Sequence, residues 1–112
     1  MSKESDLLVI MRALADPVRL RVVETLSAGP LRAGELAAKL AVPAPAMSKH
    51  LRVLLDAGVV GDERRREDAR VRVFRLRGES VLAVRAWLDQ LQAHWDEQLA
   101  AFKTQVESSV RQ

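Results

Sequence analysis

Hydrophobic residues recur three and four positions apart in the first quarter of the chain, which predicts two amphipathic helices. The first extends over about residues 5–15. Asp16 and Pro17 follow it. Because aspartate caps free backbone amides and proline is tolerated at the first helical position, a second helix is expected to begin here. It carries apolar residues on one side as far as Leu26, and the Ala-Gly-Pro sequence at residues 28–30 ends it.

Two further helices, separated by about three residues, predict a helix-turn-helix unit over about residues 33–57. The first helix of this unit is short, residues 33–40, with leucines four positions apart. The second, residues 44–57, is followed by Gly58 as a left-handed stop, and its apolar face is formed by Met47, Leu51, Leu54 and Leu55. In such units the second helix lies in the major groove of DNA, with its N-terminal residues at the base edges.

A charged hairpin and a long helix complete the pattern. β-Branched and aromatic residues at positions 71–76, preceded by a Val-Val strand opening, predict a two-stranded wing over about residues 59–77. Apolar residues then recur at helical spacing up to Val106. They predict a helix over about residues 79–107, roughly 40 Å long at ~1.5 Å per residue. The expected fold is mainly α with a small β-hairpin, a single winged helix-turn-helix domain over residues 1–112.

Composition and charge narrow the classes of function. The chain of 112 residues has no cysteine, which excludes disulfides, thiolate metal sites and cysteine nucleophiles. No apolar run approaches the roughly 18 residues that cross a bilayer, so we expect a cytoplasmic protein with no membrane partner. Residues 1–78 carry 15 Lys and Arg against 10 Asp and Glu, whereas residues 79–112 carry 3 against 5. The first two-thirds of the chain is therefore expected to face a polyanion.

The outward face of the second helix of the helix-turn-helix unit carries candidate DNA contacts. At ~100° per residue, with Met47 pointing inward, Lys49 and Arg52 point outward and Ser48 flanks them. We expect Lys49 to contact a base or a phosphate, and Ser48 and Arg52 to contact phosphates; the alternative is an ordinary solvated helix face. His50 projects beside the core. It is either packed at the rim with a local hydrogen bond or in contact with a phosphate or base.

The wing holds seven arginines and four acidic residues. Arginines at a strand tip can follow the phosphate backbone or enter a narrow minor groove, and opposite charges can also pair across the strands. We expect Arg72 and Arg75 to have such structural roles. The candidate DNA contacts of the wing are Arg64, Arg65, Arg66 and Arg70.

Four segments resemble the arsenical-repressor (ArsR/SmtB) family of bacterial winged-helix regulators: residues 13–21, 34–37, 45–54 and 56–60. The Ser-Lys-His-Leu sequence in the third segment and the Ala-Gly-Val-Val that follows are the most specific part, and the resemblance covers roughly residues 8–77. It implies a homodimeric repressor with DNA contacts at Ser48, Lys49 and His50. It also implies a dimer interface on the first and last helices, for which the candidates are Leu7, Leu8, Met11, Leu91, Trp95, Leu99 and Phe102. The alternative for Trp95 is that it caps the core of its own subunit.

Three residues depart from the family pattern around the turn. The family often has Gly where Ala41 stands, Ser where Pro43 stands and Gln where Ala44 stands. If the left-handed turn is kept, Ala41 costs about 1–2 kcal/mol. Without the serine, the second helix lacks a side-chain N-cap. Without the glutamine, it lacks a side chain that can form two hydrogen bonds with adenine.

Metal sensing is not expected. Relatives that bind metals through cysteines on the helix-turn-helix have them where this chain has none. Others use an Asp-x-His and a His-x-x-His/Glu on the last helix. His94 and Glu97 supply the second half, but Val81 and Ala83 stand where the first should lie, and two ligands are below the three or four that zinc needs. We expect no metal and no cofactor, and the sequence does not name an effector.

Two other classes of function fit the sequence less well. A winged-helix module for protein or RNA binding would usually expose apolar residues where Lys49 and Arg52 stand. An enzyme is not expected, because Ser48 and His50, the only nucleophile and base close together, point in different directions without a third orienting group. We therefore predict a sequence-specific regulator of transcription, a homodimeric repressor that binds an inverted repeat in double-stranded DNA, with no catalytic residue.

Overall fold

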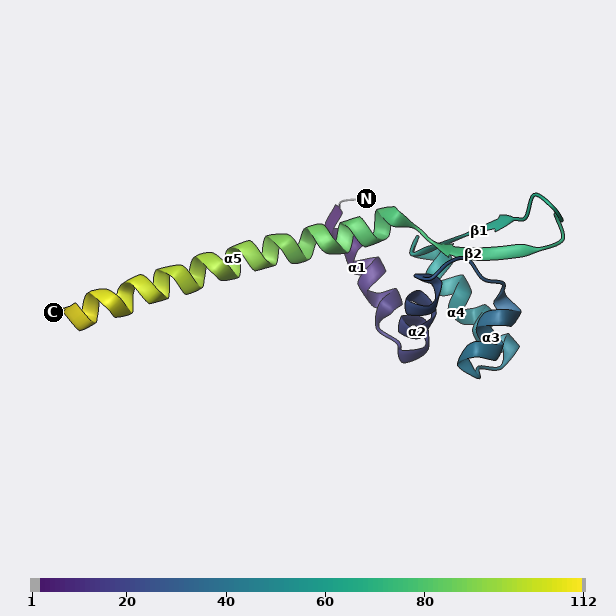
Figure 1. Cartoon of the computed structure of the whole chain (residues 1–112), viewed down its shortest axis with the longest axis horizontal. Coiled ribbons are helices and arrows are strands. Elements are labelled where there is room, and N and C mark those ends of the chain that lie inside the picture. Colours follow the sequence, from purple (N-terminus) through teal and green to yellow (C-terminus); the bar gives the residue numbers. More distant parts are fainter. Residues whose placement is uncertain (1–2, 112) are drawn as a thin grey trace. The chain divides into compact units, whose positions relative to one another are not determined.

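The computed structural model describes residues 3–111, which form five helices and one hairpin. The predicted order of elements and the mainly helical winged-helix fold are confirmed (Figure 1). In chain order the elements are α1 (Lys3–Leu14), α2 (Pro17–Leu26), α3 (Ala33–Leu40), α4 (Ala44–Asp56), β1 (Val60–Arg64), β2 (Arg72–Leu76) and α5 (Gly78–Arg111).

The chain divides into two compact units, Met1–Val81 and Leu82–Gln112. The first contains α1 to α4, the hairpin and the first residues of α5. The second is the remainder of α5. The single domain expected over the whole chain stays a prediction, and the two units are described separately below.

The boundary between α1 and α2 is set by Asp16 and Pro17, as the sequence predicts. Asp16 has extended backbone angles, and its Oδ1 accepts hydrogen bonds from the amides of Val18 at 2.8 Å and Arg19 at 3.1 Å. Two of the amides left free at the start of α2 are thereby satisfied. Helix α1 ends at Leu14, one residue before the expected boundary.

The turn between α3 and α4 keeps the left-handed conformation at Ala41, with φ 55° and ψ 44°. Among the described residues it is the one non-glycine residue with positive φ, at a cost of about 1–2 kcal/mol for an L side chain. Helix α4 follows Pro43 without a side-chain cap, as expected from the missing serine. The turn is therefore held by backbone bonds, such as that from the Val42 amide to the Ala37 carbonyl at 3.0 Å.

The core of the first unit is formed where α1, α2, α3, α4 and the base of the hairpin pack together. Leu31, in the α2–α3 connection, exchanges two backbone hydrogen bonds with Phe74, which attaches β2 to the helices. The buried apolar residues are Ile10, Ala13, Val22, Leu26, Leu36, Leu40, Met47, Leu51, Leu54, Val59, Val60, Val73 and Phe74. This core supports α4 from one side only.

The hairpin pairs β1 with β2 in antiparallel register, from Val60 opposite Leu76 to Arg64 opposite Arg72. Two ion pairs cross it, as the sequence predicts: Arg72 to Asp62 at 2.7 Å and Arg75 to Glu63 at 3.7 Å. The loop beyond the paired residues extends away from the helices of the first unit (Figure 1).

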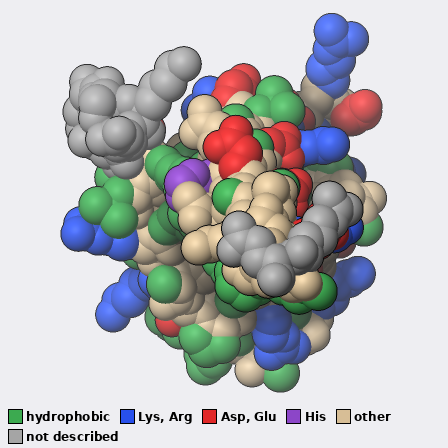
Figure 2. Space-filling model, turned by 90° about the vertical axis from the view of Figure 1, so that its left-hand side faces the viewer, with side chains coloured by type: hydrophobic (Ala, Val, Ile, Leu, Met, Phe, Trp, Pro, Cys, Tyr) green, Lys and Arg blue, Asp and Glu red, His purple; other side chains and the backbone are tan. Residues whose placement is uncertain are grey.

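Helix α5 is longer at its C-terminal end than the apolar pattern predicts, because it continues past Val106 to Arg111 through residues that do not stop a helix. Its 34 residues correspond to about 50 Å at ~1.5 Å per residue. Its large apolar side chains are exposed, and hydrophobic side chains reach the surface among charged ones in Figure 2. No helix in the described part of the chain is long and apolar enough to cross a membrane.

Candidate nucleic-acid interface

The outward face of α4 carries the polar and cationic side chains expected from the sequence. Met47 and Leu51 are buried beneath it, at 0% and 2% exposure, whereas Ser48, Lys49 and Arg52 are exposed. Among the described residues neither Lys49 nor Arg52 takes part in an ion pair. Both charges are therefore available to a polyanion.

His50 lies on the same helix but does not share this outward face. Its side chain is 21% exposed, and its Nδ1 lies 3.2 Å from Nη1 of Arg19 and 4.0 Å from Oδ1 of Asp16. Of the two interpretations left open by the sequence, the geometry matches a histidine packed at the rim with a local hydrogen bond. The structure thus separates His50 from Lys49 and Arg52.

A small hollow lies between α3, α4 and β2, with a volume of about 130 Å³. Ser48 and Arg52 line it from α4, and Arg72 lines it from β2. Arg72 is held in place by Asp62, and its Cζ lies 4.7 Å from the centre of the Phe74 ring. The sequence indicated only the cross-strand role of Arg72. That it also faces the hollow depends on how the hairpin packs beside α4.

The four candidate arginines near the hairpin tip fall into two classes. Arg64, Arg65 and Arg66 are exposed, and within the described residues they form no ion pair. Arg70 instead donates to both oxygens of Asp68, at 3.0 and 3.1 Å, and its guanidinium lowers the pKa of that carboxyl. An ion pair this exposed contributes little to stability, so a phosphate can compete with Asp68 for Arg70.

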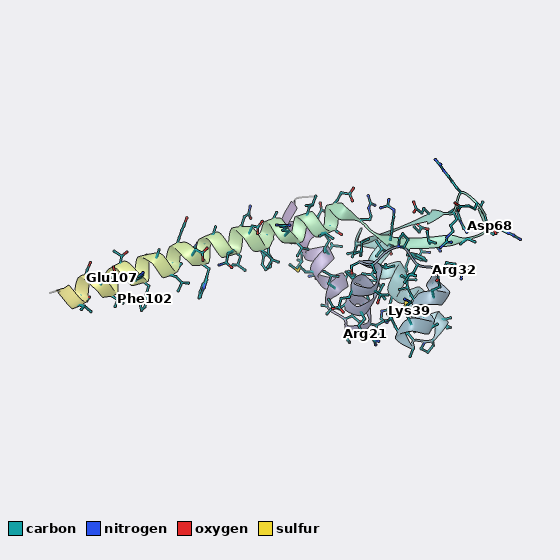
Figure 3. All side chains as sticks on the ribbon, in the orientation of Figure 1. Arg21, Arg32, Lys39, Asp68, Phe102 and Glu107 are labelled. Atoms are coloured by element: carbon teal, nitrogen blue, oxygen red, sulfur yellow. The ribbon has the colours of Figure 1, made fainter. Side chains whose placement is uncertain are left out.

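The candidate dimerisation residues lie in both units. On α1, Leu8 is 51% exposed, and Leu7 and Met11 are half-buried. On α5 the four predicted residues are 50–67% exposed, and Figure 3 shows one of them, Phe102, extending from the helix into open space. The four are Leu91, Trp95, Leu99 and Phe102.

The described residues contain no group of three or more His, Cys, Asp or Glu side chains placed to hold a metal ion. His94 and Glu97, the two residues that match half of a metal motif, are both exposed on α5. The first half of that motif is missing at Val81 and Ala83, as the sequence shows.

Known proteins resemble both the sequence and the fold. Residues 14–61 match a family model described as a helix-turn-helix domain. The chain is 39% identical over 97 residues to the HTH-type transcriptional regulator Rv2034 of Mycobacterium tuberculosis, covering 87% of this chain and 85% of that protein. It is 37% identical over 62 residues to the biofilm growth-associated repressor of Agrobacterium fabrum, covering 55% of this chain and 53% of that one.

The fold is also similar to that of the ArsR family transcriptional regulator RHA00566. The crystal structure of that protein superposes with a TM-score of 0.72 at 35% sequence identity, covering 83% of this chain and 93% of that one. The resemblance of roughly residues 8–77 to this family is thus supported by both sequence and structure. The chain belongs to the ArsR/SmtB family of winged helix-turn-helix transcriptional regulators, which bind double-stranded DNA and are not enzymes.

Proposed function

We propose that this regulator is a homodimeric repressor that binds an inverted repeat with α4 in the major groove and the hairpin along the phosphate backbone that borders the adjacent minor groove. The observation that carries the proposal is the outward face of α4, where Lys49 and Arg52 are exposed and free of ion pairs in the described part of the chain. Lys49, near the N-terminal half of the helix, reads a base or holds a phosphate, and Ser48 and Arg52 hold phosphates.

The hairpin supplies the second set of contacts. Arg64, Arg65 and Arg66 carry three charges near its tip that form no ion pair with any residue the structure describes, and Arg70 adds a fourth when it exchanges Asp68 for a phosphate. Because α4 offers no glutamine or asparagine for adenine, direct base readout is limited. The shape and electronegative potential of the minor groove contribute relatively more to specificity.

The dimer forms through α1 and α5. A long stripe of exposed apolar side chains is a liability in a monomer and is typical of a protein interface. Leu88, Leu91, Trp95 and Leu99 are each 50–59% exposed, and they recur every three or four residues along α5. Two-fold symmetry then places two copies of α4 about 34–36 Å apart, one turn of DNA. Repression, rather than activation, is supported by relatives named as repressors.

Sequencing of the DNA fragments retained by the purified protein tests this function. The expected result is an inverted repeat with half-sites about 10–10.5 base pairs apart, or a multiple of that spacing, bound by one dimer in footprinting. A lone half-site, or preferential retention of RNA, would contradict the proposal. RNA retention would favour the alternative of a winged-helix module for another partner.

A further inference from the structure

The side chain of Arg19, on α2, contacts residues at the end of α1, at the cap of α2 and on α4. Arg19 stands in the first turn of α2, and its side chain is 17% exposed. Its Nε donates to the carbonyl of Ala13 in the last turn of α1, and its Nη1 lies 3.2 Å from Nδ1 of His50 on α4. The same Nη1 lies 3.9 Å from Oδ2 of Asp16, the cap of α2. One guanidinium therefore contacts the end of α1, the cap of α2 and the middle of α4.

The chemistry of this contact fixes the tautomer of His50. A guanidinium has only donors, so Nδ1 of His50 must accept, and the proton of the neutral ring is on Nε2. Asp16 stays ionised beside Arg19, since the amides of Arg19 and Val18 and the Arg19 charge lower the pKa of its carboxyl. A mostly buried arginine is thus given the partners that make its burial tolerable.

Directional bonds matter here because much of the packing of α4 beside α1 and α2 is apolar. Ile10 and Ala13 on α1 and Met47 and Leu51 on α4 are buried, and burial of this kind has no preferred direction. A planar guanidinium with fixed donor positions does have one. His50 is the neighbour of Lys49, so a rotation of α4 that broke the bond to Arg19 would also turn Lys49.

We propose that Arg19 is a positioning residue for sequence recognition, which acts through His50 to hold α4 in the rotation that presents Lys49 to DNA. His50 then contributes to recognition from inside the protein, not by touching a base. This inference rests on the proposed function, because it concerns how the same face reads an operator.

Two replacements of His50 separate this role from direct contact. In Asn, Oδ1 lies close to where histidine has Nδ1. In Gln, the amide reaches the place of Nε2. His50→Asn keeps an acceptor for Arg19, and His50→Gln loses it while keeping a polar group at the outer end of the side chain. Affinity is measured for the selected operator and for random DNA, and the ratio of the two is the readout.

Arg19→Lys removes the planar group while keeping the charge, since one ammonium cannot take the place of both Nε and Nη1. Arg21→Lys is the matched control on the same helix. Arg21 is exposed (Figure 3), and among the described residues its side chain takes part in no ion pair. The melting temperature of every variant is recorded, so that a loss of folding is not mistaken for a loss of recognition.

We expect His50→Gln and Arg19→Lys to reduce the ratio of operator to random affinity about tenfold, the effect of losing one charge-assisted hydrogen bond. The double variant should lose no more than either single one, since both remove the same bond. His50→Asn and Arg21→Lys should stay near the wild type.

The opposite pattern would overturn the inference. If His50→Gln kept the wild-type ratio of operator to random affinity while His50→Asn lowered it, His50 would be shown to touch DNA. The inference would also be overturned if Arg19→Lys kept the wild-type ratio of operator to random affinity. Equal losses of affinity for operator and random DNA in both His50→Gln and Arg19→Lys would overturn it too. If the wild type itself prefers no sequence, the proposed function fails, and that result is distinct from any of these.

Discussion

The two compact units differ in whether their apolar side chains are buried or exposed. In the first unit, thirteen apolar residues are buried, and Leu54 in α4 is 0% exposed. In the second, none of the described residues from Leu82 to Val110 is buried, and Phe102 is 67% exposed. The first unit supplies its own core, and the second has apolar side chains without one. The difference supports the proposal that α5 packs against a second copy of the chain.

The largest expected effect comes from removing that surface. Leu91→Asp with Trp95→Ala places a charge and a truncation in the middle of the exposed stripe of α5, and tryptophan is enriched among residues that dominate interfaces. We expect a folded, helical monomer that has lost operator binding at nanomolar concentration, because one half-site supplies too few contacts. Sedimentation and operator titration measure the two effects.

Lys103→Ala is the control for this variant, since Lys103 is a polar, exposed residue of the same helix. It should leave both the dimer and the operator affinity unchanged. A double variant that is still dimeric, or a wild type that is monomeric at micromolar concentration, would show that the apolar stripe has another purpose.

The first unit should respond differently, with losses of affinity rather than loss of assembly. Lys49→Ala should reduce operator binding by roughly 1–3 kcal/mol if Lys49 contacts guanine, while random DNA is affected less. Competition titrations with operator and random duplexes measure the difference. Equal losses on both would assign Lys49 to phosphate contact alone.

Arg64→Ala or Arg65→Ala should have a smaller and more uniform effect, because these arginines at the hairpin tip meet the phosphate backbone. Affinity for all sequences should fall alike. The slope of log affinity against log salt concentration should fall in magnitude by about one, which corresponds to one phosphate contact. Titrations at several salt concentrations give the slope. A loss confined to the operator would instead place the arginine on a base edge or in a sequence-dependent minor groove.

Local chemistry made most of the fold predictable from the sequence. Asp16 and Pro17 define a helix boundary by themselves. The left-handed turn at Ala41 was expected only from the resemblance, because the family often has glycine at this position. The charged face of α4 follows from helical geometry once Met47 is assigned to the core. The end of α5 was less predictable, because no glycine or proline follows Val106.

Contacts between distant segments were not predictable. Helical geometry places His50 beside the core, but its partner Arg19 is 31 residues earlier and becomes a neighbour only when α2 packs on α4. The same holds for Arg72, whose position beside Ser48 and Arg52 depends on how the hairpin lies against the helices. The pairing of Arg70 with Asp68 is local, but it was not predictable either. More than one acidic residue lies close to Arg70 in the sequence, so its partner could not be chosen from the sequence alone.

The smallest expected effect concerns metal ions and sharpens the assignment of α5 as an interface. Each chain matches only the half of the metal motif that His94 and Glu97 supply on this helix, with no thiol, and a closed zinc site needs three or four well-placed ligands. Operator affinity should therefore be the same with added zinc and with chelator. If zinc changes the affinity tenfold or more, and the change disappears in His94→Ala, then two copies of α5 assemble a metal site. The apolar stripe would in that case be part of a sensor as well as an interface.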